Sequence, residues 1–293
     1  MARALSPTAL AGFDSLEGPC HSRDMKKIFL LLTGIFVFSG CATTTQKGAT
    51  GVHRSQLMLV SSDEVNQAAA QSYEQTIKQA ENKKALDVNA EEVQRVTMIA
   101  SRLIPQTATF REDAVHWQWA VHVISSNELN AYCMPGGKIV FYSGIIEKLK
   151  LTDGEIAAVM GHEISHALRE HGRERISEEM AKQEGLQILS IFAGGTAAYA
   201  GSLLSDMMFS LPFSRKQETE ADIMGTELMA RAGFNPQEAL SLWKKMGSAG
   251  GNKPPELLST HPSDSKRLDR IASLMPKVMP LYEATQKNNY FLK

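Results

Sequence analysis

Residues 161–166 read Gly-His-Glu-Ile-Ser-His, and the rest of the chain can be interpreted around this stretch. Positions i and i+4 of an α-helix differ by only about 40° around the axis, so His162 and His166 would share one face. Two imidazoles one turn apart can bind a single Zn²⁺ at roughly 2.0–2.1 Å. Glu163 is rotated off that face, where it can reach a metal-bound water without becoming a ligand. The stretch therefore predicts a zinc site on a helix, with a carboxylate beside the metal.

The residues before this stretch predict that it is helical. Thr152 and Glu155 have the spacing of a capping box, in which each side chain binds the backbone N–H of the other residue. Apolar residues then recur at helical spacing, namely Ile156, Val159, Met160 and Ile164. We expect a helix from about residue 153 to 171, with Gly172 just beyond its C-terminal end.

Composition bounds the class of protein. The chain has 293 residues, a formal net charge of -1 and 43% hydrophobic residues, which is typical of one large or two small globular domains. Basic runs with interleaved aromatic residues are absent from the sequence, so nucleic acid is not an expected partner. Cys20, Cys41 and Cys133 form no CxxC pair, which argues against a thiolate metal site and against a disulfide framework.

The N-terminal region has the layout of a targeting segment. A basic start at residues 25–27 precedes an apolar run over residues 28–38, and the sequence Phe-Ser-Gly-Cys follows at residues 38–41. We therefore expect residues 25–40 to be a signal peptide. Residues 1–24 would then be an over-extended start.

The end of this segment resembles a bacterial lipobox, in which small residues precede a cysteine that becomes lipidated. That resemblance implies that Cys41 is the first mature residue and carries acyl chains, and Ala42 after it resembles an outer-membrane sorting signal. The alternative is an ordinary signal peptide in which Cys41 is incidental. The Thr-, Gly- and Ala-rich residues 41–53 are expected to form a tether between the lipid and a folded domain over residues 54–293.

Periodicity outlines the other elements near the motif. A period of 3.6 predicts helices, and a period of two predicts half-buried strands. We expect helices at about residues 62–82, 90–103 and 144–150, and strands at about residues 117–123 and 138–143. The uncharged stretch over residues 185–205 has the length of a membrane span. One crossing would separate the zinc helix from the carboxylates described next, so we expect a buried helix or helical hairpin.

A catalytic zinc needs three protein ligands and one open position. Glu218 and Asp222 are i and i+4 on a predicted helix and share a face, whereas Glu220 points away. One carboxylate can bind the metal while the other accepts the ring N–H of a ligating histidine. Glu220→Ala is accordingly expected to leave zinc binding unchanged. Taken alone, the same pattern also fits a charged, solvated helix face.

The motif together with Ser-Arg-Lys-Gln-Glu-Thr-Glu-Ala-Asp at residues 214–222 resembles the zinc metallopeptidase family that contains HtpX and the CAAX prenyl proteases. The family pattern is HExxH followed by ExxxD. The resemblance extends to residues 130–131, 135–137 and 259–263, and it spans roughly residues 55–275. It is strongest to periplasmic, lipid-anchored members without tetratricopeptide repeats. It implies an α+β fold, a mostly helical zincin-type metallopeptidase domain with a small β-sheet beside the HExxH helix.

The resemblance also implies roles for individual residues. His162, His166 and Glu218 would bind one Zn²⁺ per chain. Glu163 would be the general base that takes a proton from water and returns it to the leaving amine. Asp222 would orient a ligating histidine from behind.

Two further residues near the C-terminus match the family. His261 would lie close to the zinc, where it either binds substrate or occupies the open position, and Arg267 would stabilise the oxyanion. Independently of the resemblance, the short strand over Ile139, Val140 and Phe141 is a candidate edge for pairing with an extended substrate.

These inferences predict a zinc endopeptidase that cleaves unfolded or misassembled cell-envelope proteins. It would be anchored through Cys41 to the outer membrane of a bacterium, facing the periplasm and the outer-membrane assembly machinery. One alternative is an assembly factor or chaperone with a structural zinc. The intact Glu163 argues against it, because a structural site has no use for a general base. Another is a latent peptidase blocked by His261.

Overall fold

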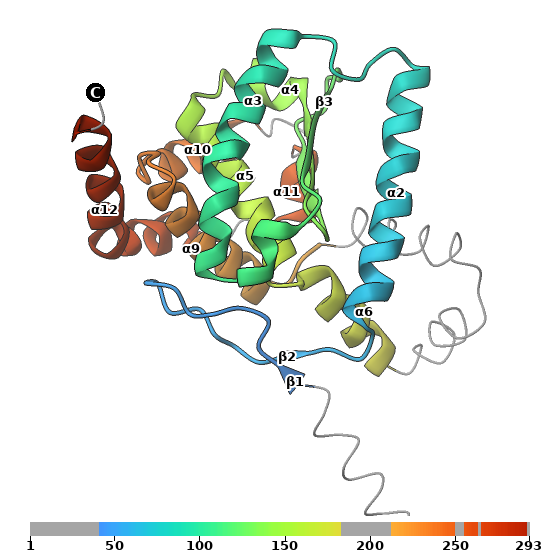
Figure 1. The fold of residues 1–293 in the computed structure, drawn as a ribbon, viewed down its shortest axis with the longest axis horizontal. Coiled ribbons are helices and arrows are strands. Elements are labelled where there is room, and N and C mark those ends of the chain that lie inside the picture. Colours follow the sequence, from blue (N-terminus) through green and yellow to red (C-terminus); the bar gives the residue numbers. More distant parts are fainter. Residues whose placement is uncertain (1–40, 183–211, 250–254, 263–264, 292–293) are drawn as a thin grey trace, which may run out of the picture. The chain divides into compact units, whose positions relative to one another are not determined.

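The structure is a computed structural model that describes residues 41–182, 212–249, 255–262 and 265–291. It is mostly helical with a small sheet, which confirms the α+β class expected from the sequence (Figure 1). The strands are β1 (Cys41–Ala42), β2 (Gln56–Leu57), β3 (Ala120–Ile124), β4 (Ala131–Met134) and β5 (Lys138–Tyr142). The α-helices are α2 (Ser62–Asn82), α3 (Ala90–Leu103), α4 (Ser143–Leu149), α5 (Asp153–Leu168), α6 (His171–Ala181), α9 (Arg215–Arg231), α10 (Glu238–Ser248), α11 (Glu256–Thr260) and α12 (Arg267–Phe291). Two 3₁₀ helices, Ile104–Thr109 and Glu112–His116, connect α3 to β3.

The main sheet has three strands in the order β3-β5-β4. β5 runs parallel to β3 and antiparallel to β4, with Val140 opposite both His122 and Tyr132. The strand that we expected to be an edge is therefore the central one, and both sides of its backbone are already paired. The prediction of a substrate edge at Ile139, Val140 and Phe141 is wrong, since all three are fully buried.

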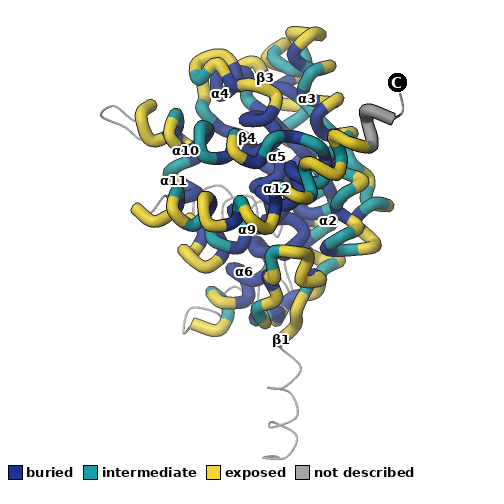
Figure 2. The backbone as a smooth tube through the Cα atoms, turned by 90° about the vertical axis from the view of Figure 1, so that its left-hand side faces the viewer, coloured by how far each residue is buried: buried dark blue, intermediate teal, exposed yellow. Residues whose placement is uncertain are grey.

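Helices cover both faces of this sheet, and the side-chain alternation along β5 divides the core between them. Val140 points to the face covered by α2, where Tyr73 packs. Ile139 and Phe141 point to the opposite face, into the large core formed with α3 and α5. Figure 1 shows the sheet nearly edge-on, between α2 and the α3–α5 pair. Figure 2 shows α5 as the most completely buried helix of this arrangement.

The capping box at the start of α5 is present as expected. The backbone N–H of Thr152 donates to Glu155 over 2.9 Å, and the N–H of Glu155 donates to the Thr152 hydroxyl over 3.1 Å. The helix ends earlier than expected, at Leu168. Glu170 takes a left-handed backbone conformation with φ 51°, and a new helix begins directly after it. Gly172 therefore lies inside α6 and does not terminate α5.

The other expected elements agree with the structure to different degrees. The helices predicted at residues 62–82 and 90–103 are α2 and α3, with the same bounds. The strand predicted from residue 117 begins only at Ala120, because the two tryptophans before it are used for packing. Their rings stack at 5.5 Å, and Trp119 Nε1 donates to the carbonyl of Ala114 over 2.7 Å.

The segment after Cys41 is packed onto the domain, so the tether expected over residues 41–53 is wrong. Its residues up to Leu57, called the strap here (residues 43–57), make many hydrogen bonds with the rest of the fold. The backbone N–H groups of Ala49 and Thr50 both donate to Glu227 over 2.8 Å. The compact unit therefore begins at Cys41, not at residue 54.

Two predictions concern residues that the structure does not describe. Residues 1–40 contain the expected signal peptide, and the apolar stretch 185–205 lies within the undescribed residues 183–211. Within the described ranges, none of the helices has the length and hydropathy needed to cross a bilayer.

Candidate metal centre

The centre is built where α5 crosses α9 with backbone against backbone. A Cβ atom on Gly161 would lie 2.8 Å from the carbonyl oxygen of Gly225, and one on Gly225 would lie 2.7 Å from the backbone nitrogen of His162. Such distances exclude a side chain at either position. The crossing therefore brings the histidines of α5 against the acidic face of α9.

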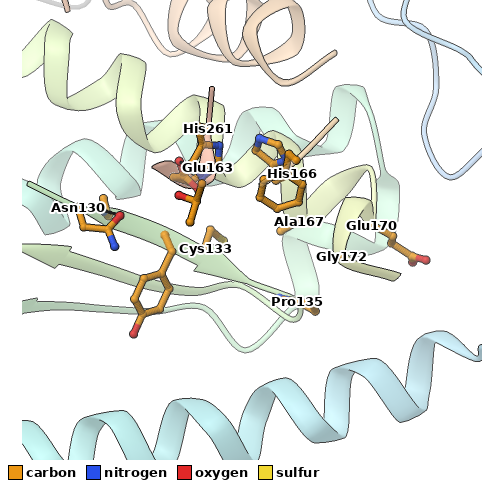
Figure 3. Close-up of a pocket in the computed structure, with 13 residues that line it drawn as sticks. Asn130, Cys133, Pro135, Glu163, His166, Ala167, Glu170, Gly172 and His261 are labelled. Atoms are coloured by element: carbon orange, nitrogen blue, oxygen red, sulfur yellow. Dashed lines mark hydrogen bonds and ion pairs between the residues drawn. The ribbon is translucent and has the colours of Figure 1, made fainter. Parts of the chain in front are cut away.

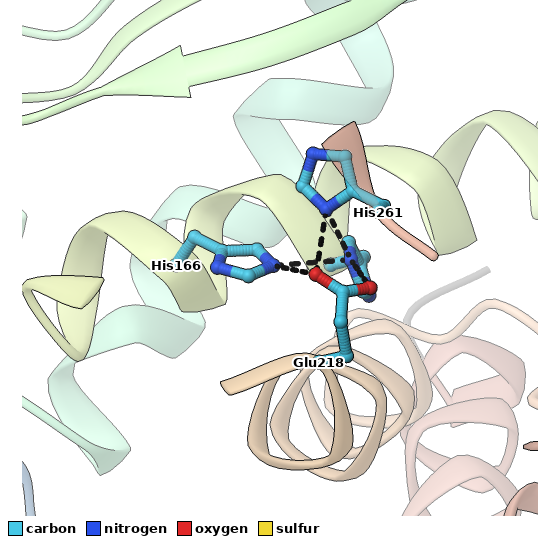
Figure 4. A group of neighbouring side chains, drawn as sticks. His166, Glu218 and His261 are labelled. Carbon is cyan, nitrogen blue, oxygen red and sulfur yellow. Dashed lines mark hydrogen bonds and ion pairs between the residues drawn. The ribbon is translucent and has the colours of Figure 1, made fainter. Parts of the chain in front are cut away.

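Four buried side chains converge at this crossing. One potential ligand atom from each of His162, His166, Glu218 and His261 lies within 4.8 Å of all the others. The Nε2 atoms of His162 and His166 are 3.2 Å apart, and they lie 3.5 and 3.3 Å from the carboxylate oxygens of Glu218. Figure 4 shows the carboxylate of Glu218 rising from α9 toward the rings of His166 and His261.

These separations match the edges of a metal-ligand tetrahedron. Ligand bonds of roughly 2.0–2.1 Å in tetrahedral geometry place neighbouring donor atoms about 3.3–3.4 Å apart. Two imidazoles and one carboxylate are a common donor set for catalytic zinc. The residues present therefore fit zinc, with the ligands that the sequence predicted.

His261 takes the fourth corner. It follows α11, and its Nδ1 atom lies 3.2 Å from His162 Nε2 and 2.9 Å from Glu218 Oε1. The ring is 4% exposed and packs on Phe213 with ring centroids 5.1 Å apart. Nδ1 of His261 thus belongs to the cluster, while its role as a substrate-binding or a blocking group stays a prediction.

The ligating rings are held from behind by buried carboxylates and a buried guanidinium. His162 Nδ1 lies 3.1 Å from Asp222 Oδ1, as the i, i+4 argument expected. Burial lowers the pKa of His162, but Asp222 and Glu218 outweigh this effect and raise it to about 9. The pKa of His166 is held well below its ordinary value by burial, despite the hydrogen bond to Glu218.

Arg267 does not occupy the place that an oxyanion-stabilising group needs. Its guanidinium donates to Asp222 over 2.7 and 3.1 Å and to Glu218 over 3.1 Å, and it stacks 3.3 Å above the ring of Trp243. Arg267 is 1% exposed and is not among the described residues that line the cleft beside the metal ligands. It therefore fixes the two carboxylates of α9 from the interior.

Glu163 lies on the cleft side of the ligands. Its side chain is buried, and its Oε1 atom has no hydrogen-bond partner among the described residues, with His261 Nε2 at 3.6 Å. Burial raises the pKa of Glu163 above its ordinary value, which suits a group that must accept and return a proton.

The cleft itself opens between α5 and the sheet. In Figure 3, Glu163, His166 and His261 face β4 and its flanking residues, where Asn130 and Cys133 lie. The strand beside the cleft is thus β4. It pairs with β5 on one side, and in the described part of the chain no strand pairs with its other side. Burial raises the pKa of the Cys133 thiol well above its ordinary value, so this thiol stays protonated.

Sequence reasoning missed His171. Its Nδ1 atom lies 2.9 Å from Nδ1 of His166, and its Nε2 atom lies 3.0 Å from Oε2 of Glu220. On one continuous helix, residues five apart differ by about 140°, so His171 would have pointed away from His166. The break at Glu170 turns it back, and nothing in the sequence marks that break, since left-handed residues are usually glycine or asparagine.

Comparison with known proteins supports a metallopeptidase. Over 165 residues, 55% of this chain and 48% of the relative, the sequence is 38% identical to the mitochondrial metalloendopeptidase OMA1 of Schizosaccharomyces pombe. It is 36% identical over 170 residues to the Arabidopsis thaliana protein of the same name, covering 57% of this chain and 34% of that one. It is also 28% identical over 183 residues to the beta-barrel assembly-enhancing protease of Escherichia coli, covering 58% and 37%.

The alignments thus span between about a third and a half of the length of these relatives. The model of peptidase family M48 matches residues 90–275, which include all four residues of the cluster. Because this match covers more than half of the 293 residues, the chain belongs to peptidase family M48.

Proposed function

We propose that this protein is a zinc-dependent endopeptidase in which Glu163 is the general base. The observation that carries the proposal is the position of Glu163 beside the four-residue cluster. Its buried Oε1 atom has no hydrogen-bond partner among the described residues and lies on the cleft side of the cluster. A zinc ion bound there would act as a Lewis acid and lower the pKa of a water. Glu163 would accept a proton from the attacking water and return it to the leaving nitrogen of the cleaved peptide bond.

The open edge of β4 supports binding of an extended substrate. An unfolded segment can add to this edge through main-chain hydrogen bonds, which are independent of side-chain identity. The edge runs along the cleft that holds Glu163, so a substrate segment paired with β4 would pass beside the carboxylate of Glu163. This replaces β5 as the substrate strand.

His261 supports a latent form of the same enzyme. Its Nδ1 atom lies 3.2 Å from His162 Nε2 and 2.9 Å from Glu218 Oε1, and imidazole is a good zinc ligand, so His261 would compete with water for a bound zinc. With His261 in place the nucleophile is excluded, and withdrawal of the segment after α11 would open the site. Arg267 donates to the backbone carbonyl of His261 over 3.5 Å, which ties that segment to the ligand helix.

The cellular role that we propose is cleavage of unfolded or misassembled envelope proteins at the outer membrane of a bacterium, with Cys41 acylated. It is supported by the lipobox-like sequence before Cys41 and by the similarity to proteins named beta-barrel assembly-enhancing protease. Such a location would place outer-membrane assembly machinery among its partners. Other relatives are named as mitochondrial, so the envelope location rests mainly on the sequence around Cys41.

The test combines metal analysis with proteolysis of an unfolded protein such as casein. Wild type should contain one zinc per chain and cleave casein, and Glu163→Gln should keep the zinc and lose cleavage. Glu74→Gln, an exposed change on α2, is the matched control and should behave as wild type. If Glu163→Gln cleaves casein at the wild-type rate, the proposed mechanism is wrong. If neither protein cleaves but both prevent casein aggregation, the chaperone alternative is the better description.

A further inference from the structure

The strap and His166 are joined by a continuous chain of polar groups, which are buried except at Arg54. The chain begins at the cluster, where Nε2 of His166 faces Nε2 of His162 and the carboxylate of Glu218. It leaves from the other side of the ring, where Nδ1 of His166 meets His171. It ends at Arg54, whose backbone belongs to the strap.

The order of donors along this chain can be assigned from its far end. Glu220 accepts from Nε2 of His171 over 3.0 Å, so the proton of His171 sits on Nε2 and its Nδ1 carries a lone pair. That lone pair faces Nδ1 of His166 at 2.9 Å, which must therefore carry the proton of its own ring. The lone pair of His166 is then on Nε2, directed at the cluster. The carboxylate of Glu220 thus selects the tautomer of His166 that can bind a metal.

Glu220 is itself fixed by two arginines from different parts of the fold. Arg54 donates to Glu220 over 2.7 Å from Nε, and Arg169 donates to it over 3.0 Å from Nη2. Arg54 also forms an ion pair with Glu174. His171 and Arg169 are completely buried, so this chain is shielded from solvent over most of its length.

The strap is also held at the same point by hydrogen bonds to backbone carbonyl groups. The backbone carbonyl of Arg169 accepts from Gln56 Nε2 over 2.7 Å and from the hydroxyl of Thr44 over 3.1 Å. The guanidinium of Arg169 in turn donates a hydrogen bond to the backbone carbonyl of Arg54 over 2.9 Å. These bonds hold the break between α5 and α6, the break that turns His171 toward His166.

We propose that His171 and Glu220, braced by Arg54 of the strap, are positioning residues that fix the ring orientation and tautomer of His166 for zinc binding. The proposal rests on the zinc site of the proposed function, but it concerns metal binding and does not require proteolysis. It makes the segment immediately after Cys41 a part of the metal centre. It also means that Glu220, expected from the sequence to be irrelevant to zinc, supports it indirectly.

A purely structural role for these groups would have a different signature. Polar residues that only hold the fold together change stability to the same extent with and without metal. Residues that orient a ligand change metal affinity and coordination geometry, typically by about 10–100-fold in affinity. Zinc affinity and the visible spectrum of the cobalt-substituted protein therefore separate the two roles.

The experiment measures zinc dissociation constants by chelator competition, the cobalt spectrum, and the melting temperature in excess chelator. The full-length variant His171→Phe replaces the imidazole by a ring of similar size that has no nitrogen acceptor. Its zinc affinity should be about 10–100-fold lower than that of wild type, and its cobalt spectrum should change. His171→Gln offers a carbonyl oxygen to His166 and should recover part of the loss. Glu220→Gln should lower zinc affinity less than His171→Phe does, and Arg54→Gln should lower it less than Glu220→Gln. Arg54→Lys should lower it less than Arg54→Gln.

The matched control is Arg95→Gln. Arg95 forms an ion pair with Asp153 and is 33% exposed, close to the 31% of Arg54, but it lies away from the metal ligands. It should leave zinc affinity and the cobalt spectrum unchanged. The proposal is overturned if His171→Phe or, should that variant not fold, Glu220→Gln binds zinc within twofold of wild type with an unchanged spectrum. If wild type binds zinc and the variants change zinc affinity as expected, but wild type cleaves no substrate, the proposed function is overturned and this inference still stands.

Discussion

Gly161 and Gly225 contact each other through their backbones at the point where the two ligand-bearing helices cross. A methyl group on Gly225 would lie 2.7 Å from the nitrogen of His162, a backbone atom that cannot move aside alone. The distance between His162 and Glu218 therefore depends on two residues that have no side chain and touch no metal. The Cβ positions of both are filled by the partner helix.

Gly225→Ala is expected to push α5 and α9 apart. We expect a loss of about 1–3 kcal/mol in unfolding free energy, the usual cost of overpacking a core, together with weaker zinc binding. Thermal unfolding with and without chelator measures both. Gly247→Ala is the control, since a Cβ at that helical position meets nothing within 4 Å. That change should be neutral or stabilise the protein by about 0.5–1 kcal/mol, and an equal response of the two variants would refute the argument.

Arg267→Met is expected to destabilise the protein and to weaken zinc binding together. Removing the guanidinium takes one cationic partner from each of the buried carboxylates Asp222 and Glu218, and breaking a buried ion pair typically costs about 3–5 kcal/mol. Arg267→Lys should recover only part, because an ammonium cannot reproduce the forked contact. Arg215→Met, an exposed change at the start of α9, is the control for denaturation and zinc titration. Reduced turnover with unchanged zinc affinity and stability would instead favour a direct role for Arg267 in catalysis.

His261→Ala is expected to raise basal proteolysis, or at least not to abolish it. The substitution removes the fourth donor and leaves the position for water, so zinc affinity should fall slightly while cleavage of casein increases. Initial rates with saturating zinc check this, and the exposed His116→Ala serves as control. Loss of activity with zinc retained would mean that His261 binds the substrate or the transition state.

Stability should depend on pH through Glu155. Burial raises its pKa, but Lys245 at 2.6 Å and Ser241 at 2.6 Å outweigh burial and hold the pKa below the ordinary 4.5. Since the folded-state pKa is lowered, this contribution is present above about pH 4.5 and is lost as pH falls through the folded-state pKa. Wild type should exceed Glu155→Gln by about 1–2 kcal/mol at pH 6, and the gap should close toward pH 3. A gap independent of pH would rule out the charged contact as its cause.

Cys41 should carry the acyl chains of a lipoprotein. Protein extracted from bacterial membranes should give an N-terminal peptide that begins at Cys41 with a mass increase from acylation. Cys41→Ser should prevent both the modification and the processing, whereas Cys133→Ser should change neither. A mature protein that starts elsewhere and is recovered without detergent would contradict the prediction.

Local signals in the sequence were sufficient for α2, for α3 and for the start of α5. The pair Thr152 and Glu155 specified the start of α5 because a capping box acts within one turn, and the i, i+4 pairs placed four site residues. The position of β5 depends on which strands pair, which no local period reveals. One signal was nonetheless present, since Ile139, Val140 and Phe141 form an unbroken apolar run, as a strand covered on both faces requires.

Long-range contacts account for the rest of what the sequence did not predict. Residues 41–53 have the composition of a linker, yet they are ordered by side chains more than a hundred positions away, among them Arg169 and Glu227. His171 is placed by a backbone turn at Glu170 that the surrounding arginines stabilise, not by a glycine. Such arrangements follow from the assembled fold and leave no pattern in a short window of sequence.

The edge of β4 that pairs with no strand in the described ranges has a kinetic consequence for the proposed enzyme. A peptide can pair with that edge only if its own N–H and C=O groups are free, and a folded protein keeps these groups in hydrogen bonds. The observed cleavage rate of a folded protein would then be the rate for its exposed form multiplied by the small fraction of time that the segment is open. A substrate variant destabilised by 1.4 kcal/mol in such local opening should be cut about tenfold faster at the same bond. The enzyme would thus distinguish damaged from intact proteins by how often a segment of the substrate opens, and it would need no recognition sequence.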